Sequence, residues 1–292
     1  MTIRHLKIFV SVYQHMSITQ AADELHIAQP SVSLAIKELE NNYHLKLFDR
    51  ISRRISPTDA GHRFYSYAIH IVSLFDQMES DAISWSGTDT IRIGSSITIG
   101  NELLPSLIAD FQTSHPENQV QVEIKNTETI TQYILDNKVD FGLVEGAVNH
   151  NSIQQEEFMD DHLSLIAAYD HPLTHSESVT LQDTAQYSFL LREPGSAGRD
   201  IIDSVYQSRG ILIQPVWESI SNHALIEGVI HNLGISILPY RILQNAIAQK
   251  QIQEIPLTDC AFSRSFSIIY HKNKYLSPSC QDFIAQCKRQ RL

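Results

Sequence analysis

Small hydrogen-bonding side chains and one cation gather along a predicted helix over residues 29–40. Gln29, Ser31 and Ser33 supply amide and hydroxyl groups, and Lys37 follows one turn later. Such groups hydrogen-bond to base edges, and a lysine contacts phosphates, so this surface suits the major groove of DNA. The alternative is that these are solvated polar residues on an ordinary surface helix.

Two short helices must position these side chains. Residues 17–25 predict a helix, because Ser17 can cap its N-terminus and Gln20 stands where a capping box needs it. Residues 26–28 suffice only for a turn, and Pro30 is tolerated in the first turn of the second helix. Two helices joined in this way form a helix-turn-helix. Its inward positions at helical spacing are Ala21, Ala22, Leu25, Ile27, Val32, Ile36 and Leu39.

A basic hairpin is predicted to follow this pair of helices. Residues 47–50 carry an apolar anchor that ends in Arg50, and residues 53–58 read as a short hairpin with Arg53 and Arg54 at or near its tip. A hairpin beside a recognition helix is a wing, whose arginines can reach phosphates or a minor groove.

The order and spacing of these motifs resemble the LysR-type transcriptional regulators. The resembling residues are Ala21-Ala22, Gln29-Pro30-Ser31-Val32-Ser33, Leu39-Glu40, Leu47-Phe48-Asp49-Arg50 and Thr58-Asp59-Ala60-Gly61. The resemblance implies a regulator rather than an enzyme, which binds double-stranded DNA and, if it activates, contacts RNA polymerase. The residues expected at the DNA are Ser17, Thr19, Gln29, Pro30, Ser31, Ser33, Lys37, Arg50, Arg53 and Arg54.

Three positions depart from the family pattern. Ala28 stands where a capping serine is usual, at a cost of about 1 kcal/mol. Leu34 replaces a frequent arginine and removes one expected DNA contact. His44 replaces a glycine where a left-handed conformation is commonly needed.

A long helix from Thr58 or Asp59 to about Trp85, ended by Gly87, is expected to join two domains. Apolar residues recur along it at heptad spacing, which suits a coiled coil between two subunits; the alternative is that they pack against their own domain. The seam consists of Phe64, Ala68, Ile71, Phe75, Met78 and Ala82. We therefore expect a winged helix-turn-helix domain over residues 1–60, a dimerisation helix over residues 61–87 and an effector domain over residues 88–292. In the resembling family the linker helix forms the dimer, and a tetramer through the effector lobes is expected.

Strands and helices alternate beyond residue 90, which predicts an α/β domain with a parallel sheet. Strands are expected at residues 91–93, 120–124, 139–144, 188–191, 215–219, 234–238 and 266–270, with helices at 102–112, 130–137, 199–208, 222–232 and from 278 onward. We expect lobe I to hold residues 90–160 and 267–292, and lobe II residues 161–266. The resemblance implies a two-lobed domain like a type 2 periplasmic binding protein, behind a winged helix-turn-helix domain rich in α-helix.

A small and anionic effector is expected between these lobes. Hydroxyls and free N–H groups at a helix start favour anions, which indicates Ser95, Ser96 and Thr98 in lobe I and Ser196 and Arg199 in lobe II. Weaker candidates are Glu145 and His223, and each of these residues could instead be only a cap or loop residue. The segment Glu193-Pro194-Gly195-Ser196 resembles the branch of the family that senses sulfur compounds or metabolites of carbon fixation.

The charge of the chain is unevenly distributed. The net charge is −11, yet residues 1–64 hold 8 Lys and Arg against 6 Asp and Glu, which leaves 14 of the 22 basic and 27 of the 33 acidic residues elsewhere. The acidic part would be repelled by DNA, so binding is expected in the N-terminal domain alone.

Cysteines and apolar segments indicate the compartment. An odd count, Cys260, Cys280 and Cys287, has no paired framework, which favours a reducing environment. No signal-peptide-like segment and no uninterrupted apolar span occur, so we expect a cytoplasmic protein without a membrane partner.

Two short segments resemble catalytic or metal-binding motifs, but the residues around them do not support either function. Asp140-Phe141-Gly142 lacks the other kinase motifs, and Pro172 separates His171 from His175, so we expect neither an enzyme nor a metal site, and no cofactor beyond an unidentified co-effector. The alternative function is a solute-binding protein or small-molecule enzyme with an accessory helix-turn-helix domain.

Overall fold

The computed structural model describes residues 1–51, 54–83 and 89–289, which divide into two compact units. One unit holds the described residues of 1–88 together with 135–137 and 273–275, and the other holds the remaining described residues. No helix in this described part of the chain has the length and apolarity that crossing a bilayer requires.

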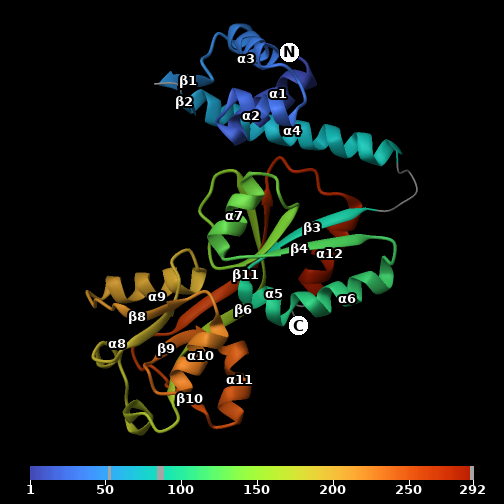
Figure 1. Ribbon diagram of the computed structural model, residues 1–292. Coiled ribbons are helices and arrows are strands. Elements are labelled where there is room, and N and C mark those ends of the chain that lie inside the picture. Colours follow the sequence, from blue (N-terminus) through green and yellow to red (C-terminus); the bar gives the residue numbers. More distant parts are fainter. Residues whose placement is uncertain (52–53, 84–88, 290–292) are drawn as a thin grey trace. The chain divides into compact units, whose positions relative to one another are not determined.

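The N-terminal unit contains four helices and a hairpin among its described residues (Figure 1). They are α1 (Ile3–His15), α2 (Ile18–Glu24), α3 (Gln29–Tyr43), β1 (Phe48–Ile51), β2 (Arg54–Pro57) and α4 (Asp59–Ile83). The predicted helix-turn-helix is therefore confirmed as α2 and α3. The linker helix begins at Asp59, as predicted, because Thr58 caps it by accepting the Gly61 N–H at 3.0 Å.

The residues at the ends of α2 and α3 cap these helices where their side chain or backbone conformation allows it. The Ser17 Oγ accepts the Gln20 N–H at 3.3 Å and so caps α2. Ala28 provides no side-chain cap for α3. His44 ends α3 in the left-handed conformation with φ 54°, as predicted from the position where the family has glycine.

Close packing of α1, α2 and α3 depends on small side chains. Ala21 and Ala22 are buried where α2 meets its neighbours, and Val32, Ile36 and Leu39 bury one face of α3. This arrangement confirms the predicted inward positions, and it leaves the opposite face of α3 to solvent.

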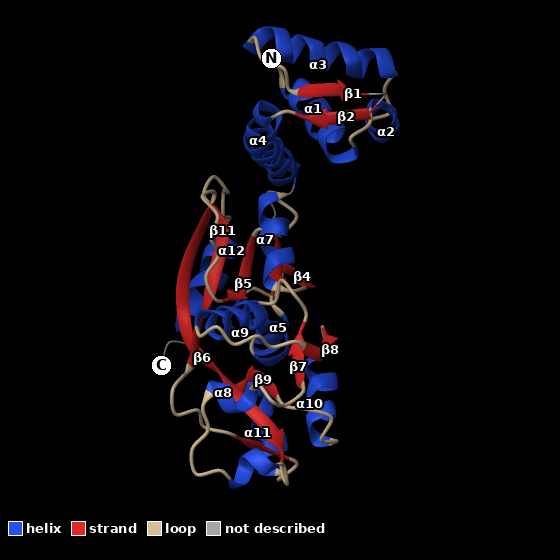
Figure 2. Cartoon of the chain, turned by 90° about the vertical axis from the view of Figure 1, so that its left-hand side faces the viewer, coloured by secondary structure: helices blue, strands red, loops and turns tan. Residues whose placement is uncertain are grey.

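The wing is tied to α3 by one carboxylate. Glu40 in α3 accepts the backbone N–H groups of Leu47 and Phe48 through Oε1, at 2.8 and 3.2 Å. The hairpin pairs Phe48 with Pro57 and Ile51 with Arg54, and Figure 2 shows it alongside α3. The recognition helix and the wing are thus held in a fixed relation.

The apolar seam predicted along α4 is only partly correct. Ala68 is buried, Phe64 packs edge-on against Phe9 with ring centroids 4.9 Å apart, and Lys7 lies over the Phe75 ring. These three seam positions therefore face their own domain, as the alternative interpretation proposed. The side chain of Ala82 and the predicted helix end at Trp85 and Gly87 lie outside the described residues.

A different stripe of α4 carries its exposed apolar side chains. Tyr67, Ile71, Leu74 and Met78 are 63%, 47%, 50% and 56% exposed. Their spacing of four, three and four residues is a heptad pattern, shifted onto the solvent face. Ile71 and Met78 belong to both the predicted seam and this exposed stripe.

The C-terminal unit is built around one mixed sheet. Its elements are β3 (Thr90–Ser95), α5 (Ile97–Glu102), α6 (Leu104–Ser114), β4 (Gln119–Ile124), α7 (Thr127–Leu135), β5 (Phe141–Glu145), β6 (Ile153–Ala168), η1 (Pro172–His175), α8 (Leu181–Thr184), β7 (Phe189–Arg192), α9 (Ala197–Ser208), β8 (Pro215–Ser219), α10 (Asn222–Ile230), β9 (Ser236–Pro239), α11 (Tyr240–Ala248), β10 (Ile252–Glu254), β11 (Phe262–His271) and α12 (Pro278–Arg289). The strand order is β10-β6-β11-β5-β3-β4, with β9 also paired to β6, and β7 with β8 forms a separate pair.

Several predicted elements needed correction. The helix expected at residues 102–112 is α6, which begins at Leu104 with Pro105 in its first turn, and the short helix α5 before it was not predicted. The predicted parallel pairing holds for β4, β3 and β5 and for β7 with β8, whereas β11 pairs antiparallel with both β5 and β6. Strands β6 and β10 and helices α8 and α11 were not predicted.

Two lobes with separate cores result. Ile93, Phe141 and Phe283 belong to the core of lobe I, whereas Phe189, Tyr206 and Ile237 belong to a core of lobe II. Strands β6 and β11 run from one lobe into the other and contribute side chains to both cores (Figure 1). Ligand groups from the two lobes can therefore meet beside these crossing strands.

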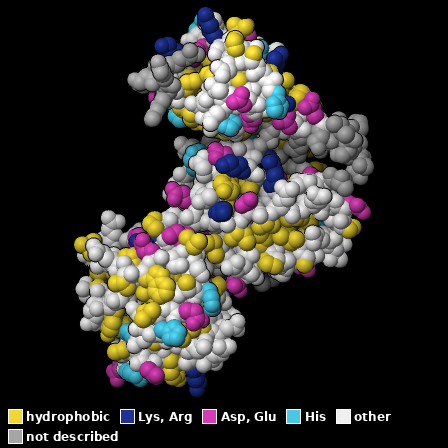
Figure 3. All heavy atoms as spheres, in the orientation of Figure 1, with side chains coloured by type: hydrophobic (Ala, Val, Ile, Leu, Met, Phe, Trp, Pro, Cys, Tyr) yellow, Lys and Arg dark blue, Asp and Glu magenta, His cyan; other side chains and the backbone are white. Residues whose placement is uncertain are grey.

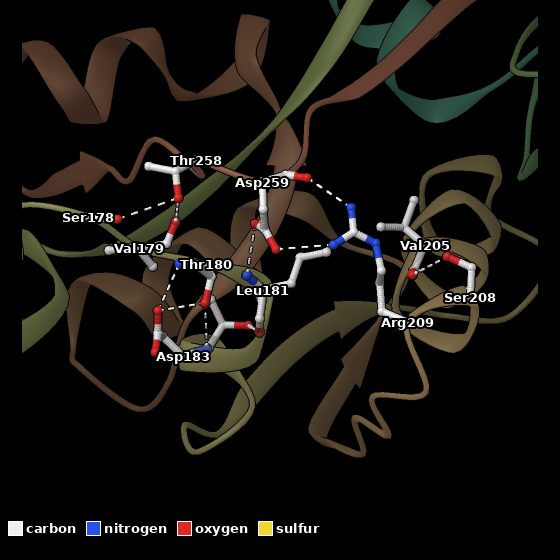
Figure 4. A network of polar contacts seen from close by, with 11 residues as sticks. Ser178, Val179, Thr180, Leu181, Asp183, Val205, Ser208, Arg209, Thr258 and Asp259 are labelled. Atoms are coloured by element: carbon white, nitrogen blue, oxygen red, sulfur yellow. Dashed lines mark hydrogen bonds and ion pairs between the residues drawn. The ribbon is translucent and has the colours of Figure 1, made fainter.

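A polar network stabilises the outer part of lobe II (Figure 4). Asp259 accepts the Leu181 N–H at 3.1 Å and pairs with Arg209 at 3.3 Å, and a capping box of Thr180 and Asp183 starts α8. These contacts join α9 to the loop after β10. Arg209 remains half exposed, so its ion pair is worth at most about 1 kcal/mol.

Candidate functional site

The outer face of α3 carries most of the residues predicted to contact DNA. Gln29, Pro30, Ser31 and Lys37 are exposed, and Ser33 is half-buried. Because the buried stripe of α3 lies on the opposite side, these side chains form one accessible surface near the start of the helix.

The first helix of the pair contributes its N-terminus to the same domain. Ser17 is half-buried and its hydroxyl oxygen caps α2, while Thr19 is exposed in the first turn. The exposed N–H groups at a helix start can donate hydrogen bonds to a phosphate oxygen.

The wing arginines are placed only by their backbone. Arg50 lies opposite Ile55, and Arg54 lies opposite Ile51, in the register of the hairpin. Arg53 lies outside the described residues, as do the side chains of Arg50 and Arg54.

In lobe I, four predicted effector residues gather at the carboxyl ends of two adjacent strands. Ser95 ends β3 beside Leu143 of β5, Ser96 and Thr98 follow at the start of α5, and Glu145 ends β5. All four are buried, with exposures of 0%, 1%, 2% and 5%. This placement follows from parallel pairing, which brings the carboxyl ends of neighbouring strands to one edge.

Two buried oxygen atoms in this group lack a hydrogen-bond partner among the described residues. They are the Ser96 Oγ and the Glu145 Oε1. The other carboxylate oxygen of Glu145 accepts from the Thr127 Oγ1 at 3.5 Å. A buried polar atom left unpaired costs about 1–3 kcal/mol, so these atoms indicate a place where a ligand or water completes the bonding.

A buried ion pair stands beside Glu145. The Arg264 guanidinium on β11 pairs with Asp161 on β6 at 2.7 Å, and its Nη2 lies 4.0 Å from the Glu145 Oε1. Arg241 adds a second cation 3.6 Å from Asp161. Asp161 therefore lies close to two guanidinium groups, whereas Glu145 lies farther from Arg264.

The Glu193-Pro194-Gly195-Ser196 loop of lobe II contacts lobe I next to Thr127, the partner of Glu145. Gly195 accepts the Glu128 N–H at 3.3 Å and has φ +82°, and a Cβ there would meet the Glu128 carboxylate at 2.4 Å. Ser196 is buried at the N-cap of α9 without capping it by its side chain. The loop therefore depends on glycine to approach lobe I.

Arg199 and His223 have other surroundings. The Arg199 guanidinium pairs with Asp203 at 2.8 Å and Glu218 at 2.6 Å and donates to the Arg192 carbonyl. Burial alone would lower the pKa of Arg199, but its bonds to Glu218 and Asp203 outweigh that effect and raise it. These contacts hold Arg199 within lobe II, and His223 is exposed in the first turn of α10.

Sequence reasoning missed Thr127, Asp161 and Arg264. Arg264 was detectable in principle, because it alternates with apolar residues in a strand, Phe262 to Phe266, and a buried arginine requires an acidic partner. The identity of that partner depends on the pairing of β6 with β11, which the sequence does not show.

No group of three or more His, Cys, Asp or Glu among residues 1–51, 54–83 and 89–289 could hold a metal ion. The pKa of the Cys287 thiol is raised to about 12 by burial, which keeps this cysteine protonated.

Comparison with known proteins covers both units. Residues 3–62 match the family described as bacterial regulatory helix-turn-helix protein, lysR family, and residues 86–291 match the LysR substrate binding domain. The HTH-type transcriptional regulator CysL of Bacillus subtilis is 31% identical over 267 residues, which cover 91% of this chain and 89% of CysL.

Solved structures share the fold. A full-length OxyR variant of Pseudomonas aeruginosa aligns with a TM-score of 0.68 and 21% identity over 100% of this chain and 98% of that one. The regulatory domain of Synechocystis PCC6803 CcmR, solved in complex with 2-PG, aligns with a TM-score of 0.65 and 22% identity over 70% of this chain and 97% of that domain.

Proposed function

This chain belongs to the LysR family of transcriptional regulators, and we propose that it binds an interrupted palindromic operator under the control of a small anionic effector. The observation that carries the proposal is the exposed face of α3, which is polar near its start and is held beside a hairpin by Glu40. We assign DNA binding to residues 1–60, dimerisation to residues 61–87 and effector binding to residues 88–292.

In this proposal each reading head uses α3 for bases and the wing for the backbone. Gln29, Ser31 and Ser33 donate to base edges or phosphates, and Lys37 contacts phosphate. Pro30 lies among them, Ser17 and Thr19 position the start of α2 at the backbone, and Arg50, Arg53 and Arg54 reach a phosphate or the minor groove. The two heads of a dimer then enter successive major grooves.

The exposed stripe of α4 supports dimerisation. Tyr67, Ile71, Leu74 and Met78 lie at heptad spacing, and a second copy of the helix would cover them. In this proposal Tyr67 and Leu74 take part in the dimer contact together with Ile71 and Met78 of the predicted seam. The seam residues Phe64, Ala68 and Phe75 pack within their own domain instead.

Exposed apolar side chains on edge strands support assembly through the effector lobes. Strand β4, at one edge of the large sheet, exposes Val122 and Ile124, and Figure 3 shows hydrophobic side chains gathered over β4 and α6. Strand β8 of lobe II exposes Val216 at 66%. Apolar surface on an edge strand favours contact with another copy, and two such faces would allow a tetramer.

The unpaired oxygens in lobe I define the effector we propose. Glu145 requires a hydrogen-bond donor, and Ser96 and Ser196 together with the start of α9 suit an acidic group. The effector would therefore carry both a hydroxyl or amino group and an acid. The CcmR regulatory domain, which has the same fold, was solved in complex with 2-PG. Ser95 and Thr98 complete the lobe I side, and Arg199 and His223 contribute at most indirectly.

Effector binding would act by favouring one arrangement of the two lobes, which requires a different affinity for each arrangement. The spacing of the reading heads would change with it. We further propose that the protein acts in the cytoplasm and, where it activates, contacts RNA polymerase.

Selection of bound duplexes from random DNA tests the proposal. The full-length protein should recover a two-fold-symmetric site, and a chain lacking residues 1–60 should recover none. Failure of both proteins over a range of salt, with and without a library of small acids, would contradict the proposal.

Replacing Arg54 by alanine should weaken binding to all DNA sequences and reduce the slope of log affinity against log salt by about 1 for each subunit, because one phosphate contact is lost. Fluorescence anisotropy between low and moderate salt measures both quantities. Lys272→Ala, in the acidic C-terminal unit, is the matched control and should leave the slope unchanged. An unaltered slope in Arg54→Ala would exclude Arg54 from the phosphate contacts.

Replacing Glu145 by glutamine should weaken the response to effectors that donate a hydrogen bond, by about tenfold or more, because a charge-assisted bond becomes a neutral one. Small acids with and without a hydroxyl or amino group can be compared by thermal shift. Glu123→Gln, on the exposed strand β4, is the control. If the glutamine variant responds to every acid as the unchanged protein does, Glu145 is not an effector ligand.

A further inference from the structure

One large apolar side chain occupies the middle of the DNA-reading face of α3. Leu34 is 56% exposed, although its neighbours Val32, Ala35, Ile36 and Leu39 in α3 are buried. Pro30, Leu34, Lys37 and Asn41 follow one another at intervals of four, three and four residues, so they share the face opposite Val32, Ile36 and Leu39. Leu34 therefore faces the solvent rather than the core of its domain.

Leu34 stands between two hollows on the surface of the domain. One lies between α3 and the wing and is lined by Ser33, Lys37, Lys46 and Asp49 as well as Leu34. The other lies toward the start of α1 and is lined by Arg4, His5, Ser31, Leu34 and Glu38. Leu34 is thus a ridge with cationic side chains on both sides.

The charges on either side fit the two backbones that border a major groove. Lys37 and Lys46 belong to one hollow and Arg4 to the other, and Glu38 is already paired with His5 at 2.8 Å. Two carboxylates, Glu40 and Asp49, also line the hollow between α3 and the wing, and Glu40 already accepts the backbone N–H groups of Leu47 and Phe48. The major groove is about 12 Å wide and admits an α-helix. A helix whose cations contact the phosphates on both sides of the groove places its central side chain at the base edges.

Only one base feature in the major groove is apolar. The C5 methyl group of thymine projects there, whereas guanine, adenine and cytosine present only donors and acceptors. A leucine at the groove floor cannot satisfy those polar groups and would leave them desolvated. We propose that Leu34 is a specificity-determining residue that recognises a thymine methyl group in each half-site; this inference rests on the DNA binding proposed above.

The test removes a single methyl group from the DNA. The operator selected by the full-length protein is resynthesised with each thymine in turn, in both half-sites, replaced by deoxyuridine. At one symmetric position this change should weaken binding by about fourfold per half-site, which is the worth of one buried methyl group.

Variants of Leu34 assign the effect to this side chain. Leu34→Ala should bind the thymine and deoxyuridine operators equally, and Leu34→Met should retain the preference because methionine keeps an apolar reach. Leu45→Ala, another exposed leucine of the same domain at 50%, is the matched control and should discriminate as the unchanged protein does. Both leucines are exposed, so unfolding temperatures should stay close to that of the unchanged protein.

Two results would overturn the inference while leaving DNA binding intact. One is a selected operator in which no deoxyuridine substitution changes the affinity. The other is a thymine preference that persists undiminished in Leu34→Ala. If no duplex is selected at all, DNA binding itself fails, and the inference with it.

Discussion

Replacing Gly61 by alanine should strongly destabilise the DNA-binding domain and weaken operator binding, while the effector domain keeps its structure and stability. A Cβ at position 61 would stand 2.1 Å from the Leu47 carbonyl oxygen and 3.3 Å from the Pro57 Cβ. That carbonyl cannot move freely, because it accepts the Thr58 N–H at 3.1 Å and the Leu47 N–H is bound to Glu40. The overlap should cost about 3 kcal/mol, at the upper end of what overpacking costs.

Hydrogen exchange followed by mass spectrometry measures this effect separately in the two units. Amides of α1, α2 and α3 should exchange about a hundred times faster in Gly61→Ala, and amides of β3 and β5 should not change. Gly198→Ala is the matched control in the first turn of another helix, where the nearest atom to the added Cβ is 3.6 Å away. It should be neutral or stabilise by up to about 1 kcal/mol. If the exchange rates of the α3 amides stay unchanged in Gly61→Ala, the Leu47 carbonyl can move to accommodate the added methyl group, and the prediction is wrong.

The N-terminal fold was predictable because its signals are local. Each signal fixes the conformation or packing of a few neighbouring residues. The signals are a capping serine before α2, a proline in the first turn of α3 and small alanines between the helices. The shifted stripe on α4 was not predictable from spacing, because Phe64 and Tyr67 are both apolar and only the position of Phe9 decides which one is buried. Tertiary contact, rather than periodicity, settles such a choice.

The effector site shows the same limit at longer range. Ser95, Ser96 and Glu145 could be placed together because each follows or ends a predicted strand of a parallel sheet. Arg264 and Asp161 are 103 residues apart in the chain and meet only through antiparallel pairing of β11 with β6. Arg199 shows the same limit within one lobe, because the sequence at a helix start suggests a ligand-facing cation but does not show the two carboxylates, Asp203 and Glu218, that pair with it.

Replacing Arg264 by methionine should destabilise the effector domain by about 3–5 kcal/mol, because Asp161 and Glu145 would remain buried without their nearest cation. Their side chains are 2% and 6% exposed, and Arg241, the remaining cation near Asp161, is 38% exposed. Urea denaturation followed by Trp217 fluorescence, with Trp85 replaced by phenylalanine in every protein, measures the loss. Arg209→Met removes an exposed pair at 3.3 Å and should cost less than about 1 kcal/mol. Equal losses in the two variants would contradict the buried pair.

The double variant Arg264→Met with Asp161→Asn separates stability from effector binding. It should recover part of the loss, with a coupling of at least about 1 kcal/mol, because removing both partners no longer strands the charge of Asp161. Glu145 keeps its carboxylate in all of these variants but loses Arg264 only where methionine is present. Affinity for a hydrogen-bond-donating effector should therefore change in both proteins that carry Arg264→Met and stay constant in Asp161→Asn alone, whatever the stability of each. A constant affinity in Arg264→Met would mean that Glu145 binds its ligand independently of the crossing strands.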